Sequence, residues 1–143
     1  MSALTRLLWL LAASLGGADH DPECLLLGGL DVVRARAFVE DDASRLRDVY
    51  VDERAARADV GVLRSYRDRG LRLDGMLMVR EACRVFARSP QRLTLEVVDR
   101  LGPTAVVSRS GETQALPHDR PTRRTVVLER SVEGWRVASV REG

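Results

Sequence analysis

The chain has 143 residues, enough for one domain with a substantial core and too few for two comfortable domains. All 23 basic residues are arginine, a bias that a GC-rich genome explains, so the arginine count is weak support for phosphate binding. Two histidines, two cysteines and no Cys-x-x-Cys pair argue against zinc and redox chemistry, and we predict no metal and no cofactor.

The net charge of +2 hides a change of sign along the chain. Residues 19–59 hold 11 acids and 6 arginines, whereas residues 60–92 hold 8 arginines and 3 acids. The most basic stretch, residues 64–72, can attract an anionic ligand or a lipid headgroup. A solvated helix face is the simpler interpretation, because Asp68 interrupts the stretch and few aromatic residues are interleaved. Nucleic acid is not expected as a partner, since no nucleic-acid-binding module is present.

Residues 1–18 have the order of a secretory signal peptide: Arg6, the apolar run Leu7–Leu15, and then small residues that end at Ala18. The apolar run is about half of what a membrane-spanning helix requires, so a stable anchor is not expected. We predict export to the cell envelope or the medium. The alternative is a cytoplasmic protein with an apolar N-terminal helix, and membrane contact is expected only through this segment.

The remaining residues, 21–143, are expected to form a single domain that starts with three helices. Asp21-Pro22 is typical of a helix start. An apolar stripe then recurs at helical spacing to about residue 40, at Leu26, Leu30, Val33 and Ala37. A shorter helix follows Asp41-Asp42, and a third is framed by Asp59 as its cap and Gly70 as its stop.

From about residue 71 the apolar period changes to two, which predicts strands. A long strand ends at the turn Ser89-Pro90-Gln91, and a later strand is expected over Thr104–Arg109. Residues 110–121 are predicted to be a polar loop. Residues 125–140 form the closing hairpin, with a glycine-containing turn. The short connections imply an antiparallel meander.

The two cysteines, Cys24 and Cys83, permit one pairing. In an oxidising compartment a disulfide between them would tie the first helix to the sheet. The alternative is a pair of buried thiols that act as small hydrophobic residues.

Residues 37–50 contain a helix, an acidic break and a second helix, and residues 134–137 read Gly-Trp-Arg-Val. Both segments resemble elements of the NTF2-like superfamily, which includes SnoaL-like cyclases, ketosteroid-isomerase-like enzymes and many non-catalytic domains. With the order of elements, the resemblance covers about residues 22–142. It implies an α+β fold in which about three N-terminal helices pack on a curved, mainly antiparallel sheet. It also implies a cone-shaped cavity and homodimerisation through the sheet.

Two carboxylates are candidates for the interior of that cavity. Strand alternation places Glu81 on one face with Cys83, and Asp99 on one face with its apolar neighbours. A buried acid has a raised pKa and can act as a general acid or base, and Tyr50 and Tyr66 can donate hydrogen bonds to an oxyanion. The alternatives are a β-bulge that turns Glu81 to solvent, pairing of either acid with arginine, and tyrosines that serve only the core.

These observations predict a non-catalytic NTF2-like domain, an accessory or small-ligand-binding module that holds a small apolar ligand. The residues expected to line its site are Tyr50, Tyr66, Glu81, Asp99 and Trp135. The alternative is a small-molecule isomerase, cyclase or hydratase that uses Glu81 or Asp99 with a tyrosine. His118-Asp119, in a proline-flanked loop, is given no catalytic role.

Overall fold

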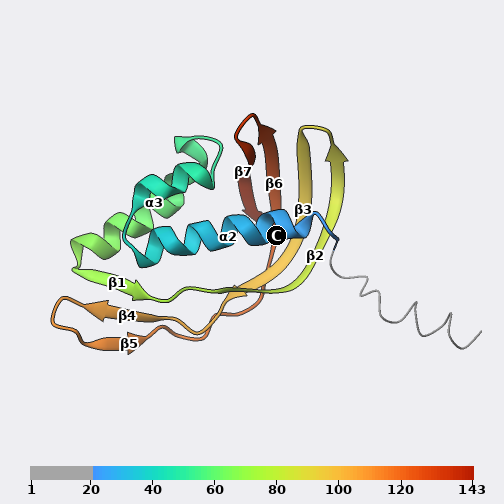
Figure 1. Ribbon diagram of the computed structural model, residues 1–143. Helices are drawn as coiled ribbons and strands as arrows, with labels where there is room; N and C mark the ends of the chain where they lie inside the picture. Colours follow the sequence, from blue (N-terminus) through green and yellow to red (C-terminus); the bar gives the residue numbers. More distant parts are fainter. Residues whose placement is uncertain (1–20) are drawn as a thin grey trace, which may run out of the picture.

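The computed structural model describes residues 21–143 (Figure 1). The predicted signal peptide, residues 1–18, lies outside this part of the chain. Helices come first and antiparallel strands follow, which confirms the α+β class. Within residues 21–143, no helix is long and apolar enough to cross a membrane.

The helical elements are α2 (Cys24–Val39), the 3-10 helix η1 (Ala43–Asp48) and α3 (Glu53–Asp68). The Asp52 carboxylate caps α3 by accepting a hydrogen bond from the backbone N–H of Ala55 at 2.8 Å. The predicted cap, Asp59, lies instead inside α3 and is buried, because Asp52 starts the helix earlier. The helix therefore carries a carboxylate into the interior.

The start of α2 differs from the expected cap in a way that ties this helix to the sheet. The Asp21 carboxylate accepts a hydrogen bond from the backbone N–H of Val85 at 2.7 Å, and Glu23 pairs with Arg88 at 2.9 Å. The Asp21 side chain thus contacts a strand, while its backbone carbonyl accepts a hydrogen bond from the Cys24 N–H of the first turn at 2.9 Å.

Seven strands of the described chain form two antiparallel sheets. The four-stranded sheet has the order β2 (Met78–Ser89), β3 (Arg92–Leu101), β6 (Thr122–Ser131) and β7 (Gly134–Glu142). The three-stranded sheet has the order β1 (Leu71–Asp74), β4 (Ala105–Ser108) and β5 (Thr113–Ala115).

The simple meander expected from the sequence is wrong, although every pairing within these sheets is antiparallel. β1 pairs with β4. β3 pairs with β6, although β4 and β5 lie between these two strands in the sequence. The predicted polar loop, residues 110–121, contains the edge strand β5. Short connections favoured neighbouring pairs, but β1 pairs along its whole length with β4 of the smaller sheet.

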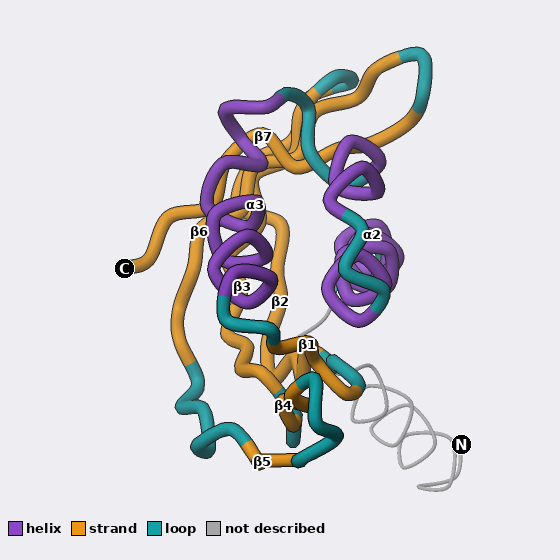
Figure 2. Tube along the Cα trace, turned by 90° about the vertical axis from the view of Figure 1, so that its left-hand side faces the viewer, coloured by secondary structure: helices purple, strands orange, loops and turns teal. Residues whose placement is uncertain are grey.

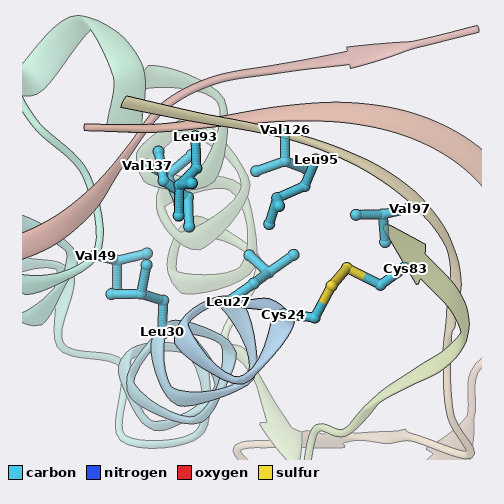
Figure 3. Packing of buried hydrophobic residues seen from close by; sticks show 11 residues of the cluster. Cys24, Leu27, Leu30, Val49, Cys83, Leu93, Leu95, Val97, Val126 and Val137 are labelled. Atoms are coloured by element: carbon cyan, nitrogen blue, oxygen red, sulfur yellow. A yellow bond between two sulfur atoms is a disulfide. The ribbon is translucent and has the colours of Figure 1, made fainter. Parts of the chain in front are cut away.

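Two apolar clusters share α2 between them. α2 and α3 lie side by side, and β1 runs beneath both (Figures 1 and 2). The first half of α2 packs on the four-stranded sheet, where Leu95 and Leu128 are fully buried (Figure 3). The second half, with Ala37 and Phe38, packs on η1, α3 and β1. Burial of a leucine of this kind stabilises the fold by about 1.5–3 kcal/mol.

A disulfide joins Cys24 to Cys83, with their Cα atoms 6.2 Å apart, and both residues are buried (Figure 3). The sequence left two alternatives, a disulfide or a pair of buried thiols, and the structure has the disulfide. The bond fixes the first turn of α2 to the middle of β2 across 59 residues of chain.

A prediction follows for the stability of the fold. Because the bridge closes a loop of 59 residues, the chain-entropy model expects the Cys24→Ala/Cys83→Ala variant to lose about 4 kcal/mol in free energy of unfolding. Urea titration followed by circular dichroism measures the loss. Reductant should bring the wild type down towards the variant and leave the variant unchanged; equal stability of the two proteins without reductant would contradict the prediction.

Candidate functional site

A cavity of about 390 Å³ lies between α2, α3 and the four-stranded sheet. Its apolar wall includes Leu27, Leu30, Val126 and Val137. Its polar wall carries the Tyr50 hydroxyl and charged residues from six different elements: Asp31, Arg34, Asp59, Arg80, Asp99, Arg124 and Glu142. The cavity is therefore amphipathic, with most of its charged groups arranged in ion pairs.

The helical side of the cavity is built on Asp59. The Arg34 guanidinium donates to both carboxylate oxygens of Asp59, at 2.6 Å from Nε and 2.9 Å from Nη2. The Tyr50 hydroxyl donates a further hydrogen bond to Asp59 Oδ2. Arg34 also stacks over the Phe38 ring, 5.3 Å from its centroid. A bidentate pair of this kind fixes both side chains in one geometry.

The sheet side of the cavity is built on Asp99, which is only 5% exposed. Arg124 Nη1 donates to Asp99 Oδ1 at 3.0 Å, and Arg80 Nη2 lies 3.5 Å from Asp99 Oδ2. The same Arg80 nitrogen donates to Asp31 of α2 at 2.5 Å. One arginine thus bridges the sheet and the helix that covers it.

Burial shifts the proton equilibria of these groups. Burial, followed by the negative charge of Asp59, raises the pKa of Tyr50 above that of ordinary tyrosine, so the phenol stays protonated and donates. Burial alone lowers the pKa of Arg34, but its hydrogen bonds to Asp59 and the charge of that group raise the pKa overall. Burial also raises the pKa of Asp31, and Arg80 offsets only part of this effect.

Glu81 requires a correction. The expected alternation along β2 is broken by a register shift between Arg80 and Ala82, which leaves Glu81 as the extra residue of a β-bulge. Its side chain is 45% exposed and lies 3.6 Å from Arg100, and it does not line the cavity. The bulge that turns Glu81 out is what keeps Arg80 directed at Asp31 and Asp99.

The other predicted site residues divide between the cavity and elsewhere. Tyr50 and Asp99 line the same cavity. Tyr66 packs against the second apolar cluster and stacks with Arg69, and Trp135 packs at the edge of the first cluster. The exposed His118 lies in a surface loop, away from this cavity.

Sequence reasoning missed six of the charged residues of the cavity, although two of them, Arg124 and Asp59, carried a usable signal. Arg124 alternates with the buried Val126, and Asp59 falls at helical spacing with the buried Ala56 and Leu63. In both residues the signal was a charge at an apolar position of the pattern. The missed residues are Asp31, Arg34, Asp59, Arg80, Arg124 and Glu142.

The arrangement holds ligands better than it performs acid–base chemistry. The three aspartates of the cavity are each held by at least one arginine, so none presents a free carboxylate to a substrate. Within residues 21–143, no three His, Cys, Asp or Glu side chains are placed to hold a metal ion.

Comparison with known proteins gives a match in structure and none in sequence. No family model matches the chain, and no curated protein has a similar sequence. Among solved structures, the chain is similar to the intermembrane space region of the chloroplast protein ARC6, with a TM-score of 0.61. The match covers 86% of this chain and 96% of that chain at 15% sequence identity. It shows a shared fold.

The disulfide bears on the compartment in which the protein works. Structural disulfides persist in oxidising compartments and are rare in the cytosol. The Cys24–Cys83 bond therefore indicates a non-cytoplasmic, oxidising compartment. Residues 1–18 predicted export to the cell envelope or the medium. The disulfide agrees with the more general part of that prediction, that the protein is not cytoplasmic.

A second prediction concerns Asp59. Asp59→Ala leaves the partly buried Arg34 and the Tyr50 hydroxyl without their acceptor, so we expect a loss of about 3 kcal/mol in free energy of unfolding. Tyr50→Phe removes one hydrogen bond and should cost about 1 kcal/mol. Urea unfolding of both variants and of the double variant measures the coupling. Additive losses would show that the tyrosine and the aspartate do not act together.

A third prediction uses the raised pKa of Asp31, whose ordinary value is 3.8. The folded protein binds this proton more tightly than the unfolded chain, so the contribution of Asp31 to stability is present at low pH and is lost as pH rises through the folded pKa. Relative to the wild type, Asp31→Asn should therefore gain stability as pH rises above 3.8. Chemical unfolding over an acid pH series tests this. A relative gain that appears as pH falls would reverse the sign and refute it.

Proposed function

We propose that this protein is a non-catalytic NTF2-like domain that works outside the cytoplasm and binds a small ligand in the cavity between α2, α3 and the sheet. The observation that carries the proposal is the cavity itself, whose volume of about 390 Å³ lies in the range of small-molecule sites. The helices-then-sheet order and the bent strands β2 and β3 in Figure 1 support the NTF2-like cone as the architecture.

The ligand that this cavity favours has an apolar body and a polar end. Leu27, Leu30 and Val137 offer an apolar wall, and the ion pairs opposite offer hydrogen-bond donors and acceptors held in place. Because the aspartates and arginines of the cavity are already paired with one another, a ligand need not carry a net charge to be accommodated. This refines the small apolar ligand expected from the sequence.

An isomerase, cyclase or hydratase is the second candidate, since Tyr50 and Asp99 line one cavity. The ion pairs argue against it. Asp99 would have to leave Arg124 and Arg80 before it could take a proton from a substrate, and Tyr50 donates its proton to Asp59 rather than into the cavity. Binding without chemistry needs neither rearrangement.

An exported accessory role fits this proposal. The disulfide supports an oxidising compartment, and the ARC6 region of similar fold is described as lying in an intermembrane space. Homodimerisation through the sheet is part of the same proposal. The aromatic ring of Phe86, 68% exposed on β2, gives that sheet an apolar contact to bury.

The test blocks the cavity at its rim. Val140 lines the cavity and is 48% exposed, so Val140→Trp should fill the entrance without disturbing the core. Anilinonaphthalene sulfonate, a fluorescent molecule with apolar rings and one charged group, is the probe. We expect saturable binding by the wild type and about a tenfold loss of affinity in Val140→Trp, equivalent to roughly 1.4 kcal/mol.

Val132→Trp is the matched control, because Val132 is fully exposed in the β6–β7 turn and lines no part of the cavity. It should bind the probe like the wild type, and thermal unfolding should show both variants folded. Equal binding by all three proteins, or no saturable binding, would refute the proposal. Catalytic turnover of a small molecule that Asp99→Asn abolishes without lowering stability would instead establish that the protein is an enzyme.

A further inference from the structure

A second concave surface lies on the other side of α3, between that helix and η1. This groove has a volume of about 1090 Å³. Four arginines line it, one from η1 and three from α3: Arg47, Arg54, Arg57 and Arg64. Tyr50 and Val60 contribute apolar surface to its floor. It is distinct from the cavity described above.

The four guanidinium groups have no partner among the residues that the structure describes. Within residues 21–143 they make neither an ion pair nor a hydrogen bond, and all four residues are exposed. Their neighbours on α3 differ, because Arg67 pairs with Asp41 at 3.1 Å and Arg69 stacks on Tyr66. The groove thus gathers four unpaired arginines on two neighbouring elements, η1 and α3.

The spacing along α3 matches an elongated occupant. Arg54, Arg57, Gly61 and Arg64 fall at intervals that place them on one face of the helix. From residue 54 to residue 64 the helix rises roughly 15 Å, the length of about four or five extended residues. A Cβ atom added at Gly61 would meet no other atom within 4 Å, so the groove is open between Arg57 and Arg64.

Three acids also line the groove, and two of them lie at the N-terminal end of α3. The Asp52 carboxylate is used as the cap of α3, and Glu53 lies in the same first turn. Glu133 comes from the β6–β7 turn. Along α3, negative charge is therefore concentrated at its N-terminal end, and positive charge lies further along, at Arg57 and Arg64.

We propose that this groove docks an extended acidic segment of a partner protein, with carboxylates on Arg57 and Arg64 and an apolar side chain against Tyr50 and Val60. Charge complementarity identifies the occupant as acidic, and the recess between two helices favours a peptide over a flat membrane surface. Exposed ion pairs of this type are weak singly and sensitive to salt. The interaction is therefore expected to weaken as ionic strength rises.

The first experiment measures binding of a short, fluorescently labelled glutamate peptide with one central leucine, by anisotropy at low ionic strength. The wild type should bind this peptide and not the corresponding lysine peptide. Arg57→Glu/Arg64→Glu should weaken binding by about tenfold or more. The matched control is Arg120→Glu/Arg141→Glu, which makes the same change of net charge at exposed arginines outside the groove. This control should keep most of the wild-type affinity.

A second variant tests the groove without changing charge. Gly61→Phe places a ring in the open space between Arg57 and Arg64. The substitution also removes a glycine from α3, and glycine is the poorest helix former other than proline. It should also weaken peptide binding, with thermal unfolding as the check that it folds. Wild-type affinity in Gly61→Phe would overturn the groove as the binding surface.

The remaining outcomes are decisive as well. Equal losses of peptide affinity in the two double-arginine variants would show that only the net charge of the protein matters, and this would overturn the proposal. Absence of glutamate-peptide binding by the wild type would overturn it as well. Phosphatidylglycerol vesicles, compared with phosphatidylcholine vesicles, test the other source of anionic charge. Vesicle binding that depends on Arg57 and Arg64, without peptide binding, would assign the surface to a membrane instead. None of these results depends on a ligand in the cavity.

Discussion

The bidentate ion pair between Arg34 and Asp59 holds the helical layer of this protein together. It joins α2 to α3 near the middle of both helices, and it supplies the acceptor for the Tyr50 hydroxyl. Tyr50 in turn forms a bridge to Val137 of β7, so the same pair also positions the helices against the sheet. With the disulfide at the start of α2 and the Asp31–Arg80 ion pair to β2, this helix is fixed at three points along its length.

Buried charges line the cavity beside the two apolar clusters of the fold. The first cluster lies between α2 and the four-stranded sheet, and the second lies between α2, η1, α3 and β1. The ion pairs of Arg34, Arg80 and Arg124 line the cavity beside them. Buried ion pairs contribute little net stability compared with apolar packing, but an unpaired member is costly. Their geometry therefore resists rearrangement, which keeps the cavity open and its polar wall fixed.

Periodicity predicted the parts of this structure that depend on local pattern. The order of helices and strands, the closing hairpin and the inward direction of Asp99 all followed from spacing. The direction of Glu81 did not, because a β-bulge between Arg80 and Ala82 breaks the alternation on which the prediction rested. The depth of Asp59 within α3 was missed for another reason: its partner, Arg34, lies 25 residues away in the chain. Long-range pairing of charges leaves only a faint trace in a single sequence.

Among residues 21–143, Tyr50 is the residue that lines both the cavity and the groove between η1 and α3. Its hydroxyl is held by Asp59 on the cavity side, and its ring forms part of the groove floor. An occupant of either site that displaces the ring must work against the Asp59 hydrogen bond. By linkage, any change that one occupant makes in the affinity for the other is returned by the same factor. Under the two proposals, Tyr50 is therefore the side chain through which a ligand in the cavity and a partner on the groove would be coupled.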